Sequence, residues 1–419
     1  MTLPLTKEWA GFRKKEFYEK DLKMKKIDIN KIKTVPKSMR RRFEVCVYGE
    51  VEQEVKDWIK ENDFHSFQSG QYTNIVIPPE TDLSEIFLEA KQFEWLDGFS
   101  PNLNKKLHIG HFSNMVLAKA FKSLGICKKT VSIYGDTIDG EIEKSEALSL
   151  LEKYQKDFDF FINKEVMASE VTYNNTLLKD GSGEYEGTKI FEIGDEKIVG
   201  IKSGGQTSYF YQDVALAEQL NSPTLYLTGN EQQNHFALLK KIYPHIQHVG
   251  LGLVKVSGKK MSSRMGNVIL MEEFIDLMKE EFDEDLKLIY NVFAGHILKS
   301  NPEVDKGINL DIINNPKNSS GLYMSYTMAR LISAGCAVSD GGNGELKSIE
   351  LNFAYLKARA NLKPNILYEE LFEHCKHINA CYAIFTIKEN SENIIMFEGL
   401  LDDLVWGCKK LGMFVITKV

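Results

Sequence analysis

One stretch of the chain decides the fold: FEWLDGFSPNLNKKLHIGHFSNMVLAKAFKSLG, residues 93–125. Its opening residues, FEWLDGF, predict a strand that ends in a loop. Apolar residues then recur at helical spacing from His108 onward, and Gly125 is typical of the position at a helix end. The following TVSIYGD, residues 130–136, predicts a second strand. A strand, a loop and a helix in this order place the first helix turn at the carboxyl edge of a sheet.

The alternation of strands and helices continues along the chain. A polar helical segment and a β-rich insertion, at about residues 140–200, precede further alternating helices and strands in DVALAEQLN, TLYLTG, HFALLKKIYPH and HVGLGLVKV. This pattern predicts an α/β fold with a Rossmann-like, doubly wound parallel sheet. Strand signals nearly vanish after about residue 270, so the C-terminal third is expected to be an α-helical bundle.

Three domains are expected from this organisation. The first would be a short α+β unit, because residues 43–78 predict a strand, a helix and a strand. The expected boundaries are 1–85 for this N-terminal unit with its basic arm, 86–275 for the Rossmann-like domain and 276–419 for the shortened helical domain.

The basic arm is the most uneven part of the charge distribution. Between Arg13 and Arg42, thirteen Lys and Arg residues stand against four Asp and Glu. Such a segment can contact RNA, although a solvated basic helix is the commoner outcome. The net charge of −7 argues against a protein that coats nucleic acid, but it is compatible with a local basic patch.

The composition suits a large folded protein. Of the 419 residues, 43% are hydrophobic, enough for a core without disulfides. The cysteines form no CxxC pair and no zinc-type spacing, so they are expected to be reduced thiols of a cytosolic protein. We expect no signal peptide and no membrane span. The cysteines are Cys46, Cys127, Cys336, Cys375, Cys381 and Cys408.

The first chemically suggestive feature is the histidine pair in LHIGHFSN, residues 107–114. His108 and His111 would lie on one face of the helix, near its positively polarised N-terminus. Two imidazole donors there can reach phosphate oxygens as charge develops in an in-line displacement at an α-phosphorus. Gly110 leaves room for an adenine or a ribose against the backbone. Taken alone, such a pair is more often two surface histidines.

The second suggestive feature is SGKKMSSRMGN, residues 257–267, between a predicted strand and a predicted helix. In this cationic loop Lys260 and the hydroxyls of Ser262 and Ser263 could close over a triphosphate. The alternative is a solvated lysine loop. KMSSR is more specific than the histidine pair, because it is longer and chemically unusual.

These two stretches, in this order, resemble the paired signatures of class I aminoacyl-tRNA synthetases, and the specific match is to arginyl-tRNA synthetase. The resemblance covers about residues 93–335. It implies an arginine–tRNA ligase that forms arginyl-adenylate from arginine and ATP. It rests on separated motifs in the family's order: DGFSPNLNKKLHIGH, KSGGQTSYFYQD, GNEQQNHF, HVGLGLV, KKMSSRMGN and YMSYTMAR.

The resemblance also implies which residues bind the amino acid. Carboxylates pair with a planar guanidinium, an amide adds direction and a tyrosine face covers the cation. Which carboxylate meets the guanidinium and which meets the α-amino group stays open. The residues at the family's positions are Asp97, Asn102, Tyr209, Asp213 and Gln232.

ATP would be held by the two signature stretches, according to the same resemblance. The family's usual second lysine in the KMSSR loop is replaced here by Ser263, and arginyl enzymes of this type supply that charge from a lysine just before the histidine stretch. The implied catalytic residues are His108, His111, Lys260 and Lys105. The implied ATP-binding residues are Gly110, His108, His111, Met261, Ser262 and Ser263. The expected cofactor is ATP with substrate-bound Mg²⁺, and no structural metal is expected.

The match weakens outside the activation motifs. The tryptophan of the family's GDWG stretch is replaced by Thr137 in GDTIDGE, and the N-terminal domain is reduced to about 85 residues. The C-terminal helical domain is short, but it begins with Tyr323, Tyr326 and Arg330, for which the resemblance implies weak tRNA contacts.

Three hypotheses therefore stay open. The first is a compact arginyl-tRNA synthetase whose partners are arginine, ATP and tRNA(Arg). The second is a paralogue that passes an activated amino acid to a non-tRNA acceptor, and the third is a non-catalytic tRNA-binding relic. The basic arm and the helical C-terminus favour tRNA, while the intact activation residues argue against a relic. A cytoplasmic monomer without a membrane partner is favoured.

Overall fold

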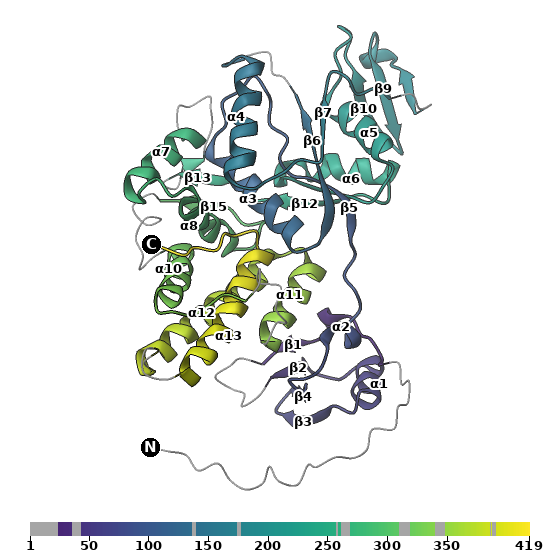
Figure 1. Ribbon diagram of the computed structural model, residues 1–419. Helices are drawn as coiled ribbons and strands as arrows, with labels where there is room; N and C mark the ends of the chain where they lie inside the picture. Colours follow the sequence, from purple (N-terminus) through teal and green to yellow (C-terminus); the bar gives the residue numbers. More distant parts are fainter. Residues whose placement is uncertain are drawn as a thin grey trace. The chain divides into compact units, whose positions relative to one another are not determined.

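The structure is a computed structural model in which most of the chain is described (Figure 1). It divides into two compact units, residues 1–88 and residues 89–419, which are treated separately below. The described segments are 24–35, 43–135, 140–173, 177–256, 259–260, 269–309, 319–339, 348–385, 387 and 391–419, with main chain only at 256, 259, 260 and 391.

The first unit is built on a four-stranded antiparallel sheet with the strand order β1-β2-β4-β3. Trp58 is fully buried, and its indole N–H donates to the main-chain oxygen of Ile86 at 3.1 Å. One strand, β3, is an edge strand that the sequence did not predict. All five of its residues are exposed, so it lacks an apolar alternation. The elements are η2 (Ile29–Lys31), β1 (Lys33–Thr34), β2 (Glu44–Tyr48), α1 (Gln53–Glu61), β3 (His65–Ser69), β4 (Tyr72–Val76) and α2 (Leu83–Ile86).

The second unit contains a five-stranded sheet with the order β12-β11-β5-β6-β7, in which every pair is parallel. This confirms the predicted α/β fold with a Rossmann-like sheet. The strands are β5 (Phe93–Asp97), β6 (Cys127–Tyr134), β7 (Lys164–Met167), β11 (Thr224–Gly229) and β12 (Gln247–Leu251). The connecting helices are α3 (Ile109–Ser123), α4 (Lys144–Asp157), α5 (Tyr209–Leu220) and α6 (Gln233–Ile242).

Both faces of the parallel sheet are covered, as its apolar strands require. Leu96, Leu225 and Leu227 pack into the core that contains α3, whereas Val131 and Tyr226 pack into the core that contains α5 and α6. The chain runs outward from β5 through β6 to β7, and then returns to add β11 and β12 on the other side. The switch point therefore lies between the carboxyl ends of β5 and β11.

The insertion in this sheet is smaller than expected. A three-stranded antiparallel sheet, β10-β9-β8, comprises β8 (Leu178–Asp180), β9 (Lys189–Ile193) and β10 (Glu196–Ile201), with the turn η4 (Gly183–Tyr185). The insertion was expected over about residues 140–200, but α4 and β7 belong to the parallel sheet and its cover. Only four residues long, β7 gives too little pattern to be recognised as a sheet strand.

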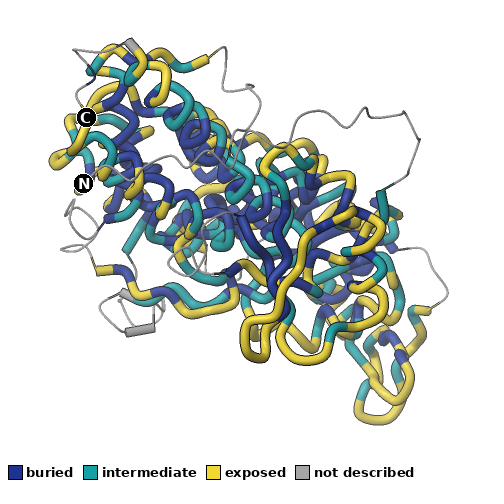
Figure 2. Tube along the Cα trace, turned by 90° about the horizontal axis from the view of Figure 1, so that it is seen from below, coloured by how far each residue is buried: buried dark blue, intermediate teal, exposed yellow. Residues whose placement is uncertain are grey.

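The C-terminal part consists mainly of helices. The helices are α7 (Met271–Glu281), α8 (Leu286–Leu298), α10 (Ser320–Ser333), α11 (Ile349–Asn361), α12 (Pro364–Ile384) and α13 (Ser391–Lys410). Buried and exposed positions alternate along them (Figure 2). Helices α8 and α10 cross closely at Gly295 and Gly321, where a Cβ on Gly321 would lie 2.1 Å from the main-chain oxygen of Asn291. This crossing requires glycine.

A third sheet of this unit, β14-β13-β15, joins strands from before α7 and after α8. Strand β13 (Val254–Val256) pairs in parallel with β15 (Lys306–Ile308) and antiparallel with β14 (Lys259–Lys260). The prediction of a helical C-terminal third misses β15, because a three-residue strand carries no period. None of the described helices is long and apolar enough to cross a membrane. All six cysteines lie in described segments, and none of them forms a disulfide.

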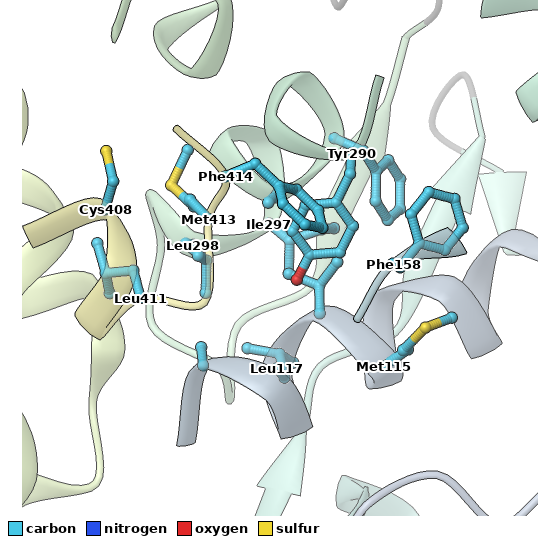
Figure 3. Close-up of a cluster of buried hydrophobic side chains, with 14 of the residues drawn as sticks. Met115, Leu117, Phe158, Tyr290, Ile297, Leu298, Cys408, Leu411, Met413 and Phe414 are labelled. Carbon is cyan, nitrogen blue, oxygen red and sulfur yellow. The ribbon is translucent and has the colours of Figure 1, made fainter. Parts of the chain in front are cut away.

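The residues after α13 return to helix α3 of the parallel-sheet part (Figure 3). Phe414 packs edge-on against Tyr290 with ring centres 5.2 Å apart, and the Lys119 ammonium lies 3.9 Å from the centre of the Phe414 ring. Asn291 fixes the same segment, accepting from the Phe414 main-chain N–H at 2.8 Å and donating to its oxygen at 2.9 Å. One hydrophobic core thus spans the sheet, α3 and the C-terminal helices.

Candidate active site

A cavity lined by both polar and apolar side chains lies at the switch point of the parallel sheet. Its volume is about 680 Å³, and it is lined by the ends of β5 and β11, the first turn of α3, the starts of α5 and α6, and the segment between β12 and β13. Ligands of doubly wound sheets bind at this place, outside the carboxyl ends of the strands. The main chain at Gly98, which lines the cavity, packs closely against α3, because a Cβ on Gly98 would lie 3.2 Å from the Ala118 side chain.

The two predicted histidines form the N-terminal cap of α3. The Nδ1 atom of His108 accepts from the Gly110 N–H at 3.1 Å, and the Nδ1 atom of His111 accepts from the His108 N–H at 3.1 Å. Their rings stack with centres 3.9 Å apart. Both rings line the cavity together with Gly110.

This capping arrangement fixes the protonation of both rings. Burial lowers the pKa of His108, and burial together with the neighbouring His108 lowers the pKa of His111 well below its ordinary value. A ring whose Nδ1 accepts from the main chain carries its proton on Nε2 when neutral. His108 and His111 are therefore neutral hydrogen-bond donors at the positive end of a helix, a setting that suits phosphate oxygens.

The predicted amino-acid residues line the same cavity. Strand β5 ends at Asp97, which is almost fully buried and accepts from the Ser100 hydroxyl at 2.5 Å. Burial, together with the nearby Asp213, raises the pKa of Asp97 to about 7, while the Ser100 hydrogen bond opposes the shift. Asn102 pairs with Gly135 across an isolated bridge, where a Cβ on Gly135 would lie 2.6 Å from its side-chain oxygen.

The second carboxylate among these residues is already paired. Asp213 of α5 lies 2.6 Å from Nε2 of His235 on α6. Helix α5 starts where the Ser208 hydroxyl accepts from the Tyr211 N–H, so Tyr209 is its first residue and stands 62% exposed at the cavity rim. Gln232 ends the turn η5 (Asn230–Gln232) and also lines the cavity. All five predicted amino-acid residues thus line one cavity.

The charge of the cavity lining is one-sided. The described lining contains three carboxylates, Asp97, Asp213 and Glu231, and neither Lys nor Arg. Such a lining attracts a cation and repels an unshielded triphosphate. A nucleotide therefore needs cations from elsewhere, from bound Mg²⁺ or from lysines outside this lining. In the described segments, no group of three or more His, Cys, Asp or Glu side chains is placed to hold a metal ion.

The predicted lysines are placed differently from the histidines. Lys105 does not line the described cavity, and its ammonium lies 3.9 Å from a carboxylate oxygen of Glu141. The main chain of Lys260 lies in β14, opposite Lys255, and its side chain is outside the described residues. The residues Met261, Ser262 and Ser263 and the substituted Thr137 also lie outside the described residues.

The predicted tRNA residues lie on α10 and do not line this cavity. Tyr326 is 50% exposed, and the Arg330 guanidinium lies 3.8 Å from the centre of the Tyr382 ring. Tyr323 packs edge-on against Phe372 with ring centres 5.7 Å apart. They belong to the surface of the C-terminal helices.

Comparisons with known proteins found similar structures and similar sequences. The arginyl-tRNA synthetase of Thermus thermophilus has a TM-score of 0.64 at 14% identity, over 93% of this chain and 96% of that one. A methionyl-tRNA synthetase of Mycobacterium tuberculosis, solved with methionyl-adenylate, has a TM-score of 0.50 at 10% identity, over 77% of this chain and 89% of that one. The fold is therefore that of the class I aminoacyl-tRNA synthetases. In sequence, the arginine–tRNA ligase of Ligilactobacillus salivarius is 26% identical over 350 residues, 74% of this chain. The chain is a distant homologue of the arginyl-tRNA synthetases.

The likeness to arginyl-tRNA synthetases covers only part of those proteins. The chain spans about half the length of the curated relatives that it matches, for example 56% of the Ligilactobacillus salivarius ligase and 53% of that of Limosilactobacillus reuteri. The latter is 25% identical over 299 residues. No protein-family model matches the chain.

Several cavity residues of this arginyl-tRNA synthetase homologue were not assigned from the sequence. Ser100 holds Asp97, and His235 holds Asp213. Ser100 could have been found as the first residue of the SPN motif, but the pairing of Asp213 with His235 joins two helices 22 positions apart and has no local signal. Glu231 lines the cavity and was also not assigned, although it lies within the quoted GNEQQNHF.

Proposed function

We propose that the protein is an arginine–tRNA ligase, which joins arginine to ATP as arginyl-adenylate and transfers the arginyl group to the terminal ribose of tRNA(Arg). The observation that carries this proposal is the cavity in which Asp97 and Asp213 face the N-terminal turn of α3. An acidic side suits a cationic amino acid, and a helix N-terminus with two donor histidines suits a nucleotide. The homology to arginyl enzymes supports arginine as that amino acid.

In this proposal the amino acid binds along the acidic side. Asp97 and Asp213 receive its two cationic groups, and Asn102 and Gln232 add amide contacts that set direction. Tyr209, exposed at the rim, covers the bound cation with its ring. In the described residues the Asp97 carboxylate accepts from the Ser100 hydroxyl, and the Asp213 carboxylate lies 2.6 Å from Nε2 of His235.

Activation is then an in-line displacement at the α-phosphorus of ATP. A carboxylate oxygen of arginine attacks, and pyrophosphate leaves with the electron pair of the broken P–O bond. His108 and His111 donate from Nε2 to the phosphate oxygens, and Gly110 leaves room for the ribose. No protein base is needed, because the arginine carboxylate is already ionised at neutral pH.

The remaining phosphate contacts are assigned to cations outside the described lining. Mg²⁺ enters with ATP, and Lys105 and Lys260 supply positive charge from the two sides of the nucleotide, with Met261, Ser262 and Ser263 of the same loop closing over it. Lys105 must leave the neighbourhood of Glu141 to reach the phosphates, a weak restraint for an exposed pair.

The acceptor step requires tRNA. A hydroxyl of the terminal ribose attacks the arginyl carbonyl carbon, AMP leaves, and the hydroxyl proton passes to solvent or phosphate. We assign the domain of residues 86–275 to catalysis. The basic arm within 1–85 and the helical part within 276–419, with Tyr323, Tyr326 and Arg330, are assigned to tRNA.

The test is charging of a total tRNA pool with labelled arginine and Mg-ATP, with lysine as the control amino acid. The proposal expects arginine-specific charging by the wild type and loss of charging in Asp97→Asn. Lys279→Met is the matched control, because Lys279 pairs with Asp276 on α7, away from the cavity. Charging of neither amino acid with cognate tRNA present would refute the ligase. Exchange of ATP with pyrophosphate in that case would point to the paralogue with another acceptor.

A further inference from the structure

Lys306, the first residue of β15, is a buried cation outside the cavity. It is 4% exposed, and its ammonium donates to the main-chain oxygens of Pro302 at 3.0 Å, Val304 at 3.0 Å and Asn301 at 3.4 Å. All three acceptors belong to the turn between α8 and β15. Two of these oxygens also accept from main-chain N–H groups, Asn301 from Val304 at 3.1 Å and Pro302 from Gly252 at 2.9 Å, so the ammonium is the donor that all three share.

This turn is bonded directly to one wall of the active-site cavity. The wall consists of Gly252, Leu253 and the start of β13. The Gly252 N–H donates to the Pro302 oxygen at 2.9 Å, and the Leu253 oxygen accepts from the Lys306 main-chain N–H at 2.8 Å. The Leu253 N–H donates to the Asp305 carboxylate at 2.8 Å. The N–H groups of Gly252 and Leu253 and the oxygen of Leu253 are therefore all hydrogen-bonded to the turn.

The fit between wall and turn leaves no room for adjustment. A Cβ on Gly252 would lie 2.2 Å from the carbonyl carbon of Val304, so the two main chains are in direct contact. The turn is also tied to η5, whose Asn230 side chain donates to the Glu303 oxygen at 2.9 Å. Any movement of the turn between α8 and β15 would therefore also move the Gly252–Leu253 wall.

The same turn sets the strand that leads into the KMSSR loop. The Asp305 carboxylate accepts from the Lys255 ammonium of β13 at 2.6 Å. On the far side of β15, His296 of α8 lies 2.7 Å from the Gly307 oxygen through Nε2. Burial lowers the pKa of His296 to about 4, so it is neutral and donates there. Strand β13 pairs with β14, which contains Lys260.

We propose that Lys306 is a positioning residue for nucleotide binding: by gathering three carbonyls it fixes the Gly252–Leu253 wall and the strand from which the KMSSR loop extends. The proposal rests on the adenylate chemistry proposed above. In it, a buried lysine outside both signature motifs sets the place of the Gly252–Leu253 wall, against which the nucleotide is placed because this wall lines the same cavity as His108, Gly110 and His111. The carboxylates of the amino-acid side, Asp97 and Asp213, are held by Ser100 and His235, outside this turn. Gln232 lies in η5, two residues after Asn230, which bonds to the turn.

The test compares Lys306→Met, which keeps the length of the side chain and removes the three donors, with the control Lys279→Met. Isothermal titration calorimetry of each full-length protein measures the Kd of Mg-ATP and the Kd of arginine separately. Amide hydrogen exchange of residues 252–256 reports on the wall itself. Asp305→Asn is the second variant, because it keeps the ammonium contacts and an acceptor for Leu253 but loses the Lys255 ion pair.

We expect the Kd of Mg-ATP to rise about tenfold in Lys306→Met, with faster exchange of the wall amides and an arginine Kd within about twofold of wild type. Asp305→Asn should show the same selectivity with a smaller effect, which keeps the test valid if Lys306→Met does not fold. An unchanged Kd of Mg-ATP, or equal weakening of both ligands, would overturn the proposal. If the wild type binds no Mg-ATP, the proposed function fails, and unchanged exchange at 252–256 would separately overturn the positioning role.

Discussion

Asp97 should make the binding of a cationic amino acid depend steeply on pH. This carboxyl is almost fully buried, and its neighbours within the cavity are the Ser100 hydroxyl and the negatively charged Asp213. Burial and Asp213 together hold its pKa at about 7 instead of the ordinary 3.8. Only the ionised form pairs with an ammonium or guanidinium group, so the ligand must find Asp97 without its proton.

The size of the effect follows from that pKa. About one-tenth of Asp97 is ionised at pH 6 and about nine-tenths at pH 8. Because the apparent Kd scales inversely with the competent fraction, arginine should bind about tenfold more weakly at pH 6 than at pH 8. Saturating arginine should release protons at pH 6, since the ligand draws the carboxyl into its ionised form.

Calorimetric titration of arginine across pH 6–8, in buffers of different ionisation enthalpy, measures both the affinity and the proton release. Asp97→Asn should bind weakly at every pH, with most of the slope removed. A wild-type affinity that is flat across this range, or an undiminished slope in Asp97→Asn, would refute the assignment of the proton to Asp97.

The raised pKa of Asp97 also makes the free energy of unfolding depend on pH. The unfolded chain gives up the Asp97 proton near pH 3.8, whereas the folded protein keeps it to about pH 7. Folding therefore loses free energy as the pH rises between these values, by at most about 4 kcal/mol above pH 7. Asp97→Asn should be more stable than wild type in urea at pH 8, and the gain should shrink toward pH 4. A variant no more stable at pH 8 would show that the buried carboxyl is not costly.

Three further substitutions test the architecture and the phosphate site. Gly321→Ala should lower the free energy of unfolding by about 2 kcal/mol or more, because the added methyl would lie 2.1 Å from the oxygen of Asn291; an unchanged urea midpoint would contradict the tight crossing. His111→Ala should slow ATP–pyrophosphate exchange about 100-fold, with tRNA present, while the arginine Kd stays constant; a near wild-type rate would remove this ring from the phosphate site. Lys119→Met should destabilise the protein by about 2 kcal/mol in thermal unfolding, since its ammonium donates to a buried turn at 2.6 Å and faces the Phe414 ring; an equal Tm would count against this clamp.

The strand, loop and helix of residues 93–125 could be predicted because their signals are local. Apolar periodicity, a terminal glycine and an N-terminal polar residue each act within a few positions. Helix α3 accordingly begins at Ile109, directly after the predicted His108. The exposed edge strand β3 and the three-residue β15 exist only through their partners, so no pattern in their own residues could reveal them.

The candidate site also has some features that the sequence could predict and others that it could not. The sequence named Asp97 and Asp213, which share one cavity although they are far apart in the chain. It could not give the neutral state of the histidine pair, because that depends on ring stacking and burial. It expected Lys105 at the phosphates, but where a long, half-exposed side chain rests is decided by its surroundings, here Glu141.

The return of Phe414 to helix α3 bears on how the chain is divided. The boundary expected between residues 275 and 276 falls inside α7 (Met271–Glu281). The residues on both sides of it contribute to one apolar core, and residues 89–419 form one compact unit. A fragment cut there would expose the face of α3 that the C-terminal residues cover. Residues 89–275 and 276–419 should therefore unfold together in a single cooperative transition. If the two fragments were expressed separately, complementation would need each fragment to remain unfolded until it meets the other.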